Sequence, residues 1–143
     1  MEVSPYLLTI GIGWIVAQGA KYLIAVVKSR NFRQLNQLYL SGNMPSAHSA
    51  TTVALASFVG LSDGVGSALF GIATMLSLIV MYDAVMVRRT VGEQGVALEN
   101  LISLAKNERV VIPRSAKGHT PLEVLVGAIV GLLIGSIVFF ATT

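Results

Sequence analysis

The chain has 143 residues, of which 54% are hydrophobic and only 12% carry a charge. Soluble domains are about a quarter charged, so a chain this apolar is expected to use a lipid bilayer as its solvent. It contains no cysteine, which excludes disulfides, thiolate zinc sites and cysteine nucleophiles. The length suits one compact unit, so residues 1–143 are expected to form a single transmembrane domain.

Four apolar segments are the predicted transmembrane helices, at residues 6–27, 47–61, 65–87 and 122–140. The first, third and fourth reach the roughly 20 residues that cross a 30 Å hydrocarbon core, and the second is shorter. Gly127, Gly131 and Gly135 form a small-residue ridge that predicts a close helix–helix contact. The expected fold is therefore an all-α integral membrane bundle of four transmembrane helices. The ridge and the small size are also compatible with a homodimer.

The connections between these segments differ in length and charge. A tight turn at residues 62–64 joins the second and third segments, whereas residues 88–118 form a long and charged connection. Within it, residues 91–104 have a partly helical apolar spacing, which predicts an amphipathic interfacial helix, followed by an irregular stretch at 107–117. The first and third loops are both basic, so the positive-inside rule predicts that they face the cytoplasm and that both termini lie outside.

Ionisable residues gather at the helix ends on that same side of the membrane. Such groups are costly in a bilayer, so each is a functional candidate. Pro45 and Pro121 are expected in the first turns of their helices, whose N-termini present free N–H groups and a positive dipole end. Together with lysine and arginine, these helix ends favour an anion such as phosphate over a metal ion. The gathered residues are Lys21, His48, Asp83, Arg88, Arg89, His119 and Glu123.

Four ordered motifs surround these residues. Gln18 and Lys21 have the spacing Gln-x-x-Lys, residues 44–49 read Met-Pro-Ser-Ala-His-Ser, residues 81–84 read Met-Tyr-Asp-Ala before Arg88 and Arg89, and residues 118–123 read Gly-His-Thr-Pro-Leu-Glu. The second and fourth resemble the motifs of the type 2 phosphatidic acid phosphatases and the related vanadium-dependent haloperoxidases. The whole pattern is similar to a divergent bacterial branch of that superfamily, which implies a phosphatase-like domain.

The resemblance implies a role for each residue. His119 would attack phosphorus while Glu123 holds its other ring nitrogen, and His48 would protonate the leaving alcohol. Arg89 is expected among these catalytic residues as well as at the phosphate. The expected phosphate ligands are Lys21, Ser46, Arg88 and Arg89, with Gln18 and Asp83 in support.

The implied activity is hydrolysis of a lipid phosphate monoester or diphosphate through a phosphohistidine, without metal or other cofactor. Phosphatidate-like, glycerophosphate-type and polyprenyl phosphates are the candidate substrates. The expected location is a bacterial inner membrane with the site facing the cytoplasm. Membrane lipids and the lipid phosphate are the expected partners, and nucleic acid is not.

Structural interpretations stand beside these roles. Thr120 to Glu123 is also a capping box, Arg88 and Arg89 also suit a membrane anchor, and Lys21 could snorkel to the headgroups. Asp83 is expected to pair with Lys21 or an arginine. Two other functions use the same residues: a non-catalytic protein that binds phospholipid headgroups, and a small lipid translocator. The chain also departs from the superfamily, with Ala47 for the usual glycine, Glu123 for the usual aspartate and a longer segment between Arg89 and His119.

Overall fold

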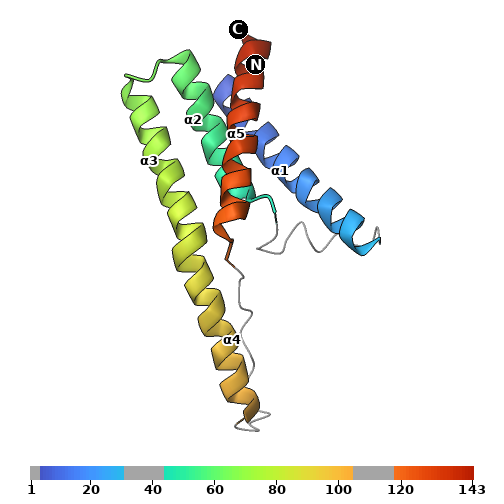
Figure 1. The fold of residues 1–143 in the computed structure, drawn as a ribbon. Helices are drawn as coiled ribbons and strands as arrows, with labels where there is room; N and C mark the ends of the chain where they lie inside the picture. The colour runs from blue at the N-terminus through green and yellow to red at the C-terminus, as the bar shows by residue number, and fades with distance from the viewer. Residues whose placement is uncertain (1–3, 31–43, 105–117) are drawn as a thin grey trace.

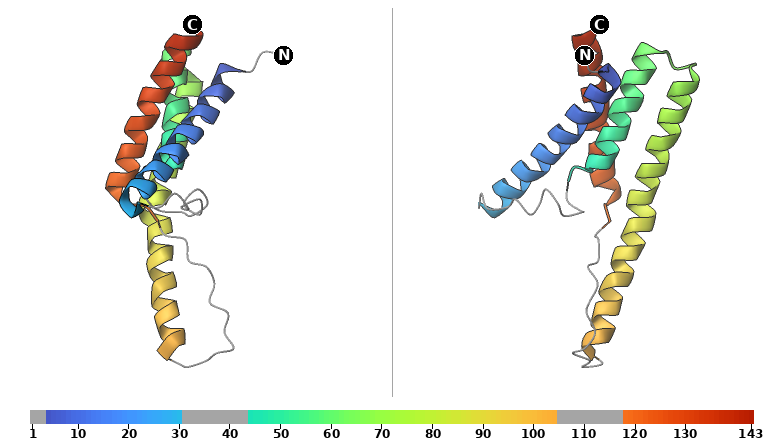
Figure 2. Two further views of the ribbon diagram at one scale, coloured as in Figure 1. Left: turned by 90° about the vertical axis from the view of Figure 1, so that its right-hand side faces the viewer. Right: turned by 180° about the vertical axis from the view of Figure 1, so that it is seen from behind.

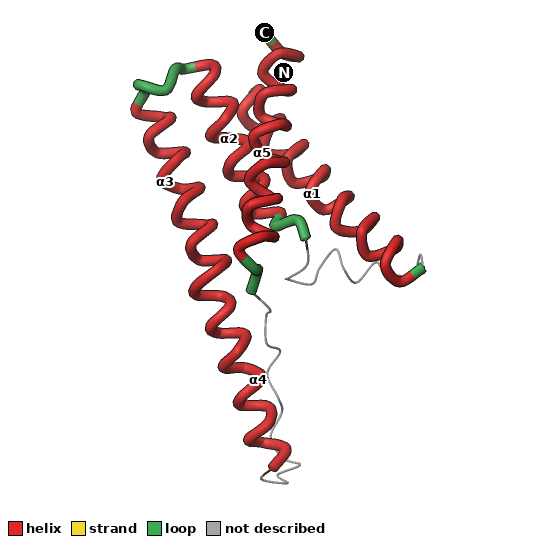
Figure 3. Tube along the Cα trace, in the orientation of Figure 1, coloured by secondary structure: helices red, strands yellow, loops and turns green. Residues whose placement is uncertain are grey.

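The computed structural model describes residues 4–30, 44–104 and 118–143, and all the regular structure in these ranges is helical (Figure 3). Successive helices run in opposite directions, except that residues 68–104 run in one direction throughout, and both chain ends lie at the same end of the bundle (Figure 1). The all-α class predicted from the sequence is therefore confirmed. In chain order the elements are α1 (Pro5–Ser29), α2 (Ala47–Ser62), α3 (Ala68–Tyr82), the π-helical turn η2 (Asp83–Val87), α4 (Arg88–Leu104) and α5 (Pro121–Thr142).

Within the described ranges, three stretches are long and apolar enough to cross a membrane, namely Pro5–Ser29, Ala68–Leu104 and Pro121–Thr142. Helix α2 has 16 residues, or about 24 Å at 1.5 Å per residue, which is shorter than the hydrocarbon core. The protein is an integral membrane protein of packed helices. That α2 is a fourth complete span stays a prediction.

Helices α3 and α4 form one continuous rod through η2, and α4 extends beyond the rest of the bundle (Figure 2). The predicted end of the third segment, Val87, is the last residue of η2, and the predicted helix in the third connection corresponds to α4. The sequence did not predict that the two continue without a break. No proline interrupts residues 82–104, so the change from apolar to charged residues does not break the helix. The interfacial position of α4 stays a prediction, and the irregular stretch predicted at 107–117 lies outside the described residues.

The start of α2 also differs from the expectation. Ser46 is the N-cap, because its hydroxyl accepts a hydrogen bond from the Ser49 N–H, so Pro45 lies just before the helix and not in its first turn. In α5 the expectation is confirmed: Pro121 opens the helix after the N-cap Thr120.

The glycine ridge of α5 packs directly against α2. An added Cβ would lie 2.6 Å from the Ser46 carbonyl oxygen at Gly127, and 2.4 Å from the Ala50 carbonyl oxygen at Gly131. The predicted close contact is confirmed, and it is made within one chain. Because α2 occupies the ridge, the ridge no longer supports a homodimer, which stays a prediction. The consequence for the site is that the first turns of α2 and α5 lie side by side.

Candidate functional site

His119 is held in place by two elements. Its ring is buried, with 6% of the residue exposed, and its Nδ1 lies 3.0 Å from Oε2 of Glu123. Its backbone N–H donates to the Ala84 carbonyl oxygen in η2, at 3.0 Å. The π-turn therefore supplies a carbonyl that fixes the residue before α5 against the α3–α4 rod. Turns of this kind are frequent at functional sites.

Glu123 serves both the histidine and the helix. Its Oε2 accepts the Thr120 N–H at 3.1 Å, and the Thr120 hydroxyl accepts the Glu123 N–H at 3.3 Å, which completes the predicted capping box. The same oxygen contacts His119, so the structural and functional interpretations of Glu123 are compatible. A carboxylate at Nδ1 favours the tautomer with hydrogen on that nitrogen, which leaves the Nε2 lone pair available as a nucleophile.

The α2 N-terminus is tied to the same place. Ser46 is fully buried; its N–H donates to the Glu123 carbonyl oxygen at 3.1 Å, and its hydroxyl lies 2.8 Å from that of Ser49. The Ser46 N–H and hydroxyl thus both make contacts within the protein, which gives Ser46 a positioning role. Its part as a phosphate ligand stays a prediction. His48, two residues on, is exposed.

Both arginines are paired with carboxylates. Arg88 Nε lies 2.6 Å from Asp83 Oδ2 across the π-turn, and Arg89 Nε lies 3.0 Å from Glu93 Oε1 one helical turn later. The prediction that Asp83 pairs with an arginine is confirmed. These side chains are about half exposed, so a bound anion can compete for them.

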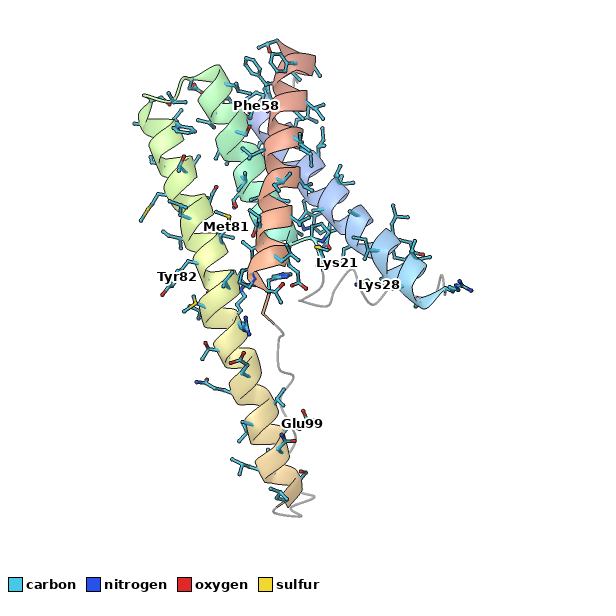
Figure 4. The ribbon with its side chains drawn as sticks, in the orientation of Figure 1. Lys21, Lys28, Phe58, Met81, Tyr82 and Glu99 are labelled. Carbon is cyan, nitrogen blue, oxygen red and sulfur yellow. The ribbon has the colours of Figure 1, made fainter. Side chains whose placement is uncertain are left out.

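Lys21 contributes from α1, where only 4% of it is exposed. Figure 4 shows it on the part of α1 near α2 and α5, with Lys28 further along the helix, where α1 leaves the bundle. The buried ammonium interacts electrostatically with Glu123. Gln18, one turn earlier on α1, is partly buried.

His48 lies within electrostatic range of Lys21 on α1, Asp83 in η2, Arg88 on α4 and His119 in the segment before α5. The structure therefore brings the ionisable residues of α1, α2, η2, α4 and α5 to one end of the bundle. Within the described ranges no group of three or more metal-ligating side chains is present.

A groove of about 400 Å³ lies beside His119, between α4 and the segment that leads into α5. Gly118 lets this segment approach α4 closely, because an added Cβ would lie 2.3 Å from both the N and Cα of Arg89. Glu93 is not among the site residues predicted from the sequence, and its four-residue spacing from Arg89 is the signal that could have found it. The described residues that line the groove are Arg89, Gly92, Glu93, Val96, Gly118, His119 and Thr120.

Comparison with known proteins bears on this arrangement. The chain matches the model of the divergent PAP2 family over residues 3–134. It is 34% identical over 134 residues to a Bacillus subtilis (strain 168) protein, the uncharacterized membrane protein YuiD, with 84% of each chain covered. No solved structure gives a significant match. The resemblance to a divergent branch of the phosphatidic acid phosphatase superfamily is confirmed.

Proposed function

We propose, because the chain belongs to the divergent PAP2 family, that it hydrolyses a lipid phosphate at the end of the bundle where His119 lies. The contact between His119 and Glu123 carries the proposal. It supplies a histidine with an oriented ring and a free Nε2, in a groove that also contains Arg89. Phosphoryl transfer needs mainly positioning and charge stabilisation, and these residues can provide both.

In the first step, His119 Nε2 forms a bond to phosphorus while the bond from phosphorus to the ester oxygen breaks. His48 donates a proton to that oxygen, so the lipid leaves as a neutral alcohol. For a diphosphate, the leaving group is the lipid monophosphate. Arg89, which lines the groove, stabilises the phosphoryl oxygens as charge develops on them, and the positive charges of Lys21 and Arg88 add to the field from outside the groove.

In the second step, water attacks phosphorus and the Nε2–P bond breaks. His48 accepts a proton from the water, and inorganic phosphate leaves. Glu123 keeps the imidazole in one orientation through both steps, because its carboxylate stays at Nδ1.

The substrate class follows from the location. The site lies at an end of apolar helices, so its natural substrates are phosphates whose apolar part stays in the bilayer. The basic residues Lys28, Arg30, Arg88 and Arg89 favour a cytoplasmic orientation, and we assign the protein to a bacterial inner membrane.

The purified chain tests the activity with phosphatidate, a polyprenyl phosphate and a polyprenyl diphosphate. Release of inorganic phosphate should persist in a chelator, since lysine and arginine supply the positive charge. Orthovanadate should block it, because vanadate adopts the trigonal bipyramidal geometry of the transition state. An acid-labile phosphohistidine should form in the wild type and be absent in His119→Ala. Activity that is lost with chelator and restored by magnesium would overturn the histidine mechanism.

A phosphate-binding protein without turnover is the second candidate. The capping box accounts for Glu123 without catalysis, which is the observation that favours this reading. Vanadate binding by folded wild-type protein that forms no phosphohistidine with any lipid phosphate would support it.

A further inference from the structure

Glu93 lies in the groove beside His119 and contacts Arg89 there. Its Oε1 is 3.0 Å from Arg89 Nε, and both side chains line the groove with His119. Arg88 differs, because its carboxylate partner is Asp83 and neither of these residues lines the groove. Of the two arginines, Arg89 is therefore the one that an anion in the groove can contact, and its guanidinium is already paired with Glu93.

We infer that Glu93 is a specificity-determining residue whose carboxylate competes with the substrate phosphate for Arg89. The role of Glu93 rests on the proposed function, since it concerns the anion bound at the same site. Phosphate must displace Glu93 from the guanidinium, and the displaced carboxylate remains near it. Like charges repel more strongly as the charge of the anion grows. Glu93 therefore weakens the binding of dianions more than that of monoanions.

The ion pair between Arg89 and Glu93 is exposed enough for an anion to displace it. The Arg89 side chain is 52% exposed and that of Glu93 is 67% exposed. A pair exposed to this degree adds at most about a fivefold factor to an equilibrium constant. A phosphate can accept two parallel hydrogen bonds from the guanidinium, and such charge-assisted pairs are stronger. When phosphate binds at Arg89, the guanidinium thus loses a weak ion pair with Glu93 and gains a stronger one with phosphate. The free energy needed to displace Glu93 reduces the net affinity for phosphate.

Isothermal titration calorimetry of the full chain in detergent tests this exchange. The probes are inorganic phosphate at mildly alkaline pH, where it is a dianion, and the monoanion dimethyl phosphate. Glu93→Gln should lower the Kd for phosphate about three- to fivefold and that for dimethyl phosphate about twofold or less. Glu99→Gln is the matched control, because Glu99 is exposed on the same helix and lies far along α4 from the bundle (Figure 4). It should change neither Kd by more than about twofold.

A double-mutant cycle separates competition for Arg89 from a general field. In an Arg89→Gln background, Glu93→Gln should lose most of its effect on phosphate binding. An undiminished effect would overturn the competition, and so would equal shifts for Glu93→Gln and Glu99→Gln. Should none of the proteins bind phosphate, the inference is overturned as well. Turnover is measured separately: phosphate binding with the expected shift but no hydrolysis refutes the proposed enzyme and supports the role of Glu93.

Discussion

Nδ1 of His119 and Oε2 of Glu123 lie 3.0 Å apart, and the same oxygen accepts the Thr120 N–H. One carboxylate thus orients the ring and caps α5. The two roles of Glu123 can be separated by experiment, because only the orientation of the ring affects the reactive nitrogen, His119 Nε2.

Glu123→Gln should lower turnover about 100-fold, because a neutral amide leaves the imidazole less well oriented. The amide oxygen can still accept the Thr120 N–H, so stability should fall by about 1 kcal/mol or less. Thr120→Ala removes the other half of the cap and should cost about 1 kcal/mol of stability. Turnover is measured beside unfolding in detergent for both variants. Equal losses of turnover would mean that Glu123 acts only through the cap.

Gly118→Ala should damage both the fold and the groove. The added methyl group would overlap the Arg89 backbone at 2.3 Å, so the segment before α5 must move away from α4. Such overpacking costs about 1–3 kcal/mol, and the displaced His119 should lose activity. Gly71→Ala in α3 is the matched control, because nothing lies within 4 Å of its added Cβ. A thermal unfolding temperature for Gly118→Ala equal to that of the control would contradict the close approach.

Gly131→Ala should destabilise the bundle without touching the site. Its Cβ would lie 2.4 Å from the Ala50 carbonyl oxygen, so α5 must move away from α2. Such overpacking should lower the free energy of unfolding by about 1–3 kcal/mol. Gly19→Ala in α1 has nothing within 4 Å and serves as the control. Unfolding in mixtures of mild detergent and dodecyl sulfate measures the difference. Equal stability of the two variants would refute the tight α2–α5 contact.

Much of this structure could be predicted because its signals are local. Apolar segments gave the helices within a few residues, and the spacing of Gly127, Gly131 and Gly135 predicted the α5 contact surface. The continuity of α3 with α4 could not be predicted from polarity, since leaving the membrane does not require a helix to end.

The gathering of ionisable residues was predicted from topology. The pairing of Asp83 with an arginine was also predicted, and the contact of Glu123 with His119 was implied by the resemblance, whereas the pairing of Arg89 with Glu93 was not predicted. The Ser46 N–H donates to the Glu123 carbonyl oxygen and its hydroxyl contacts that of Ser49, and the first of these contacts depends on how α2 packs against α5. Glu93 was missed as a site residue because a charge in a polar loop looks like ordinary solvated surface. Only the packing of residues 118–120 against α4 makes it part of a groove.

The orientation in the membrane is tested with single cysteines in this cysteine-free chain. Arg30→Cys lies at the end of α1 and Gly66→Cys in the turn at the opposite end, and both positions are exposed. An impermeant thiol reagent should label Gly66→Cys in intact cells, and label Arg30→Cys only after the membrane is opened. The reverse pattern would place the site on the outer face.

The two histidines should fail differently when replaced. His119→Ala removes the nucleophile, so no substrate should give a covalent intermediate or measurable turnover. His48→Ala removes the proton donor and should lower hydrolysis of a lipid phosphate about 100-fold or more, the usual contribution of a general acid. With p-nitrophenyl phosphate the leaving group needs little protonation, so His48→Ala should lose only about tenfold or less.

The burial of the two residues sharpens this comparison. His48 is exposed whereas His119 is buried, so His48→Ala is expected to fold normally, and His119→Gln offers a less disruptive second replacement at the nucleophile. Phosphohistidine is trapped by acid-free quenching with radiolabelled substrate, and p-nitrophenolate release is followed by absorbance. In His48→Ala, the phosphohistidine should still form from p-nitrophenyl phosphate, because the bond to His119 Nε2 does not depend on the acid. Equal loss of both substrates in His48→Ala would remove its assignment as the acid, and a phosphohistidine that survives in His119→Gln would place the nucleophile elsewhere.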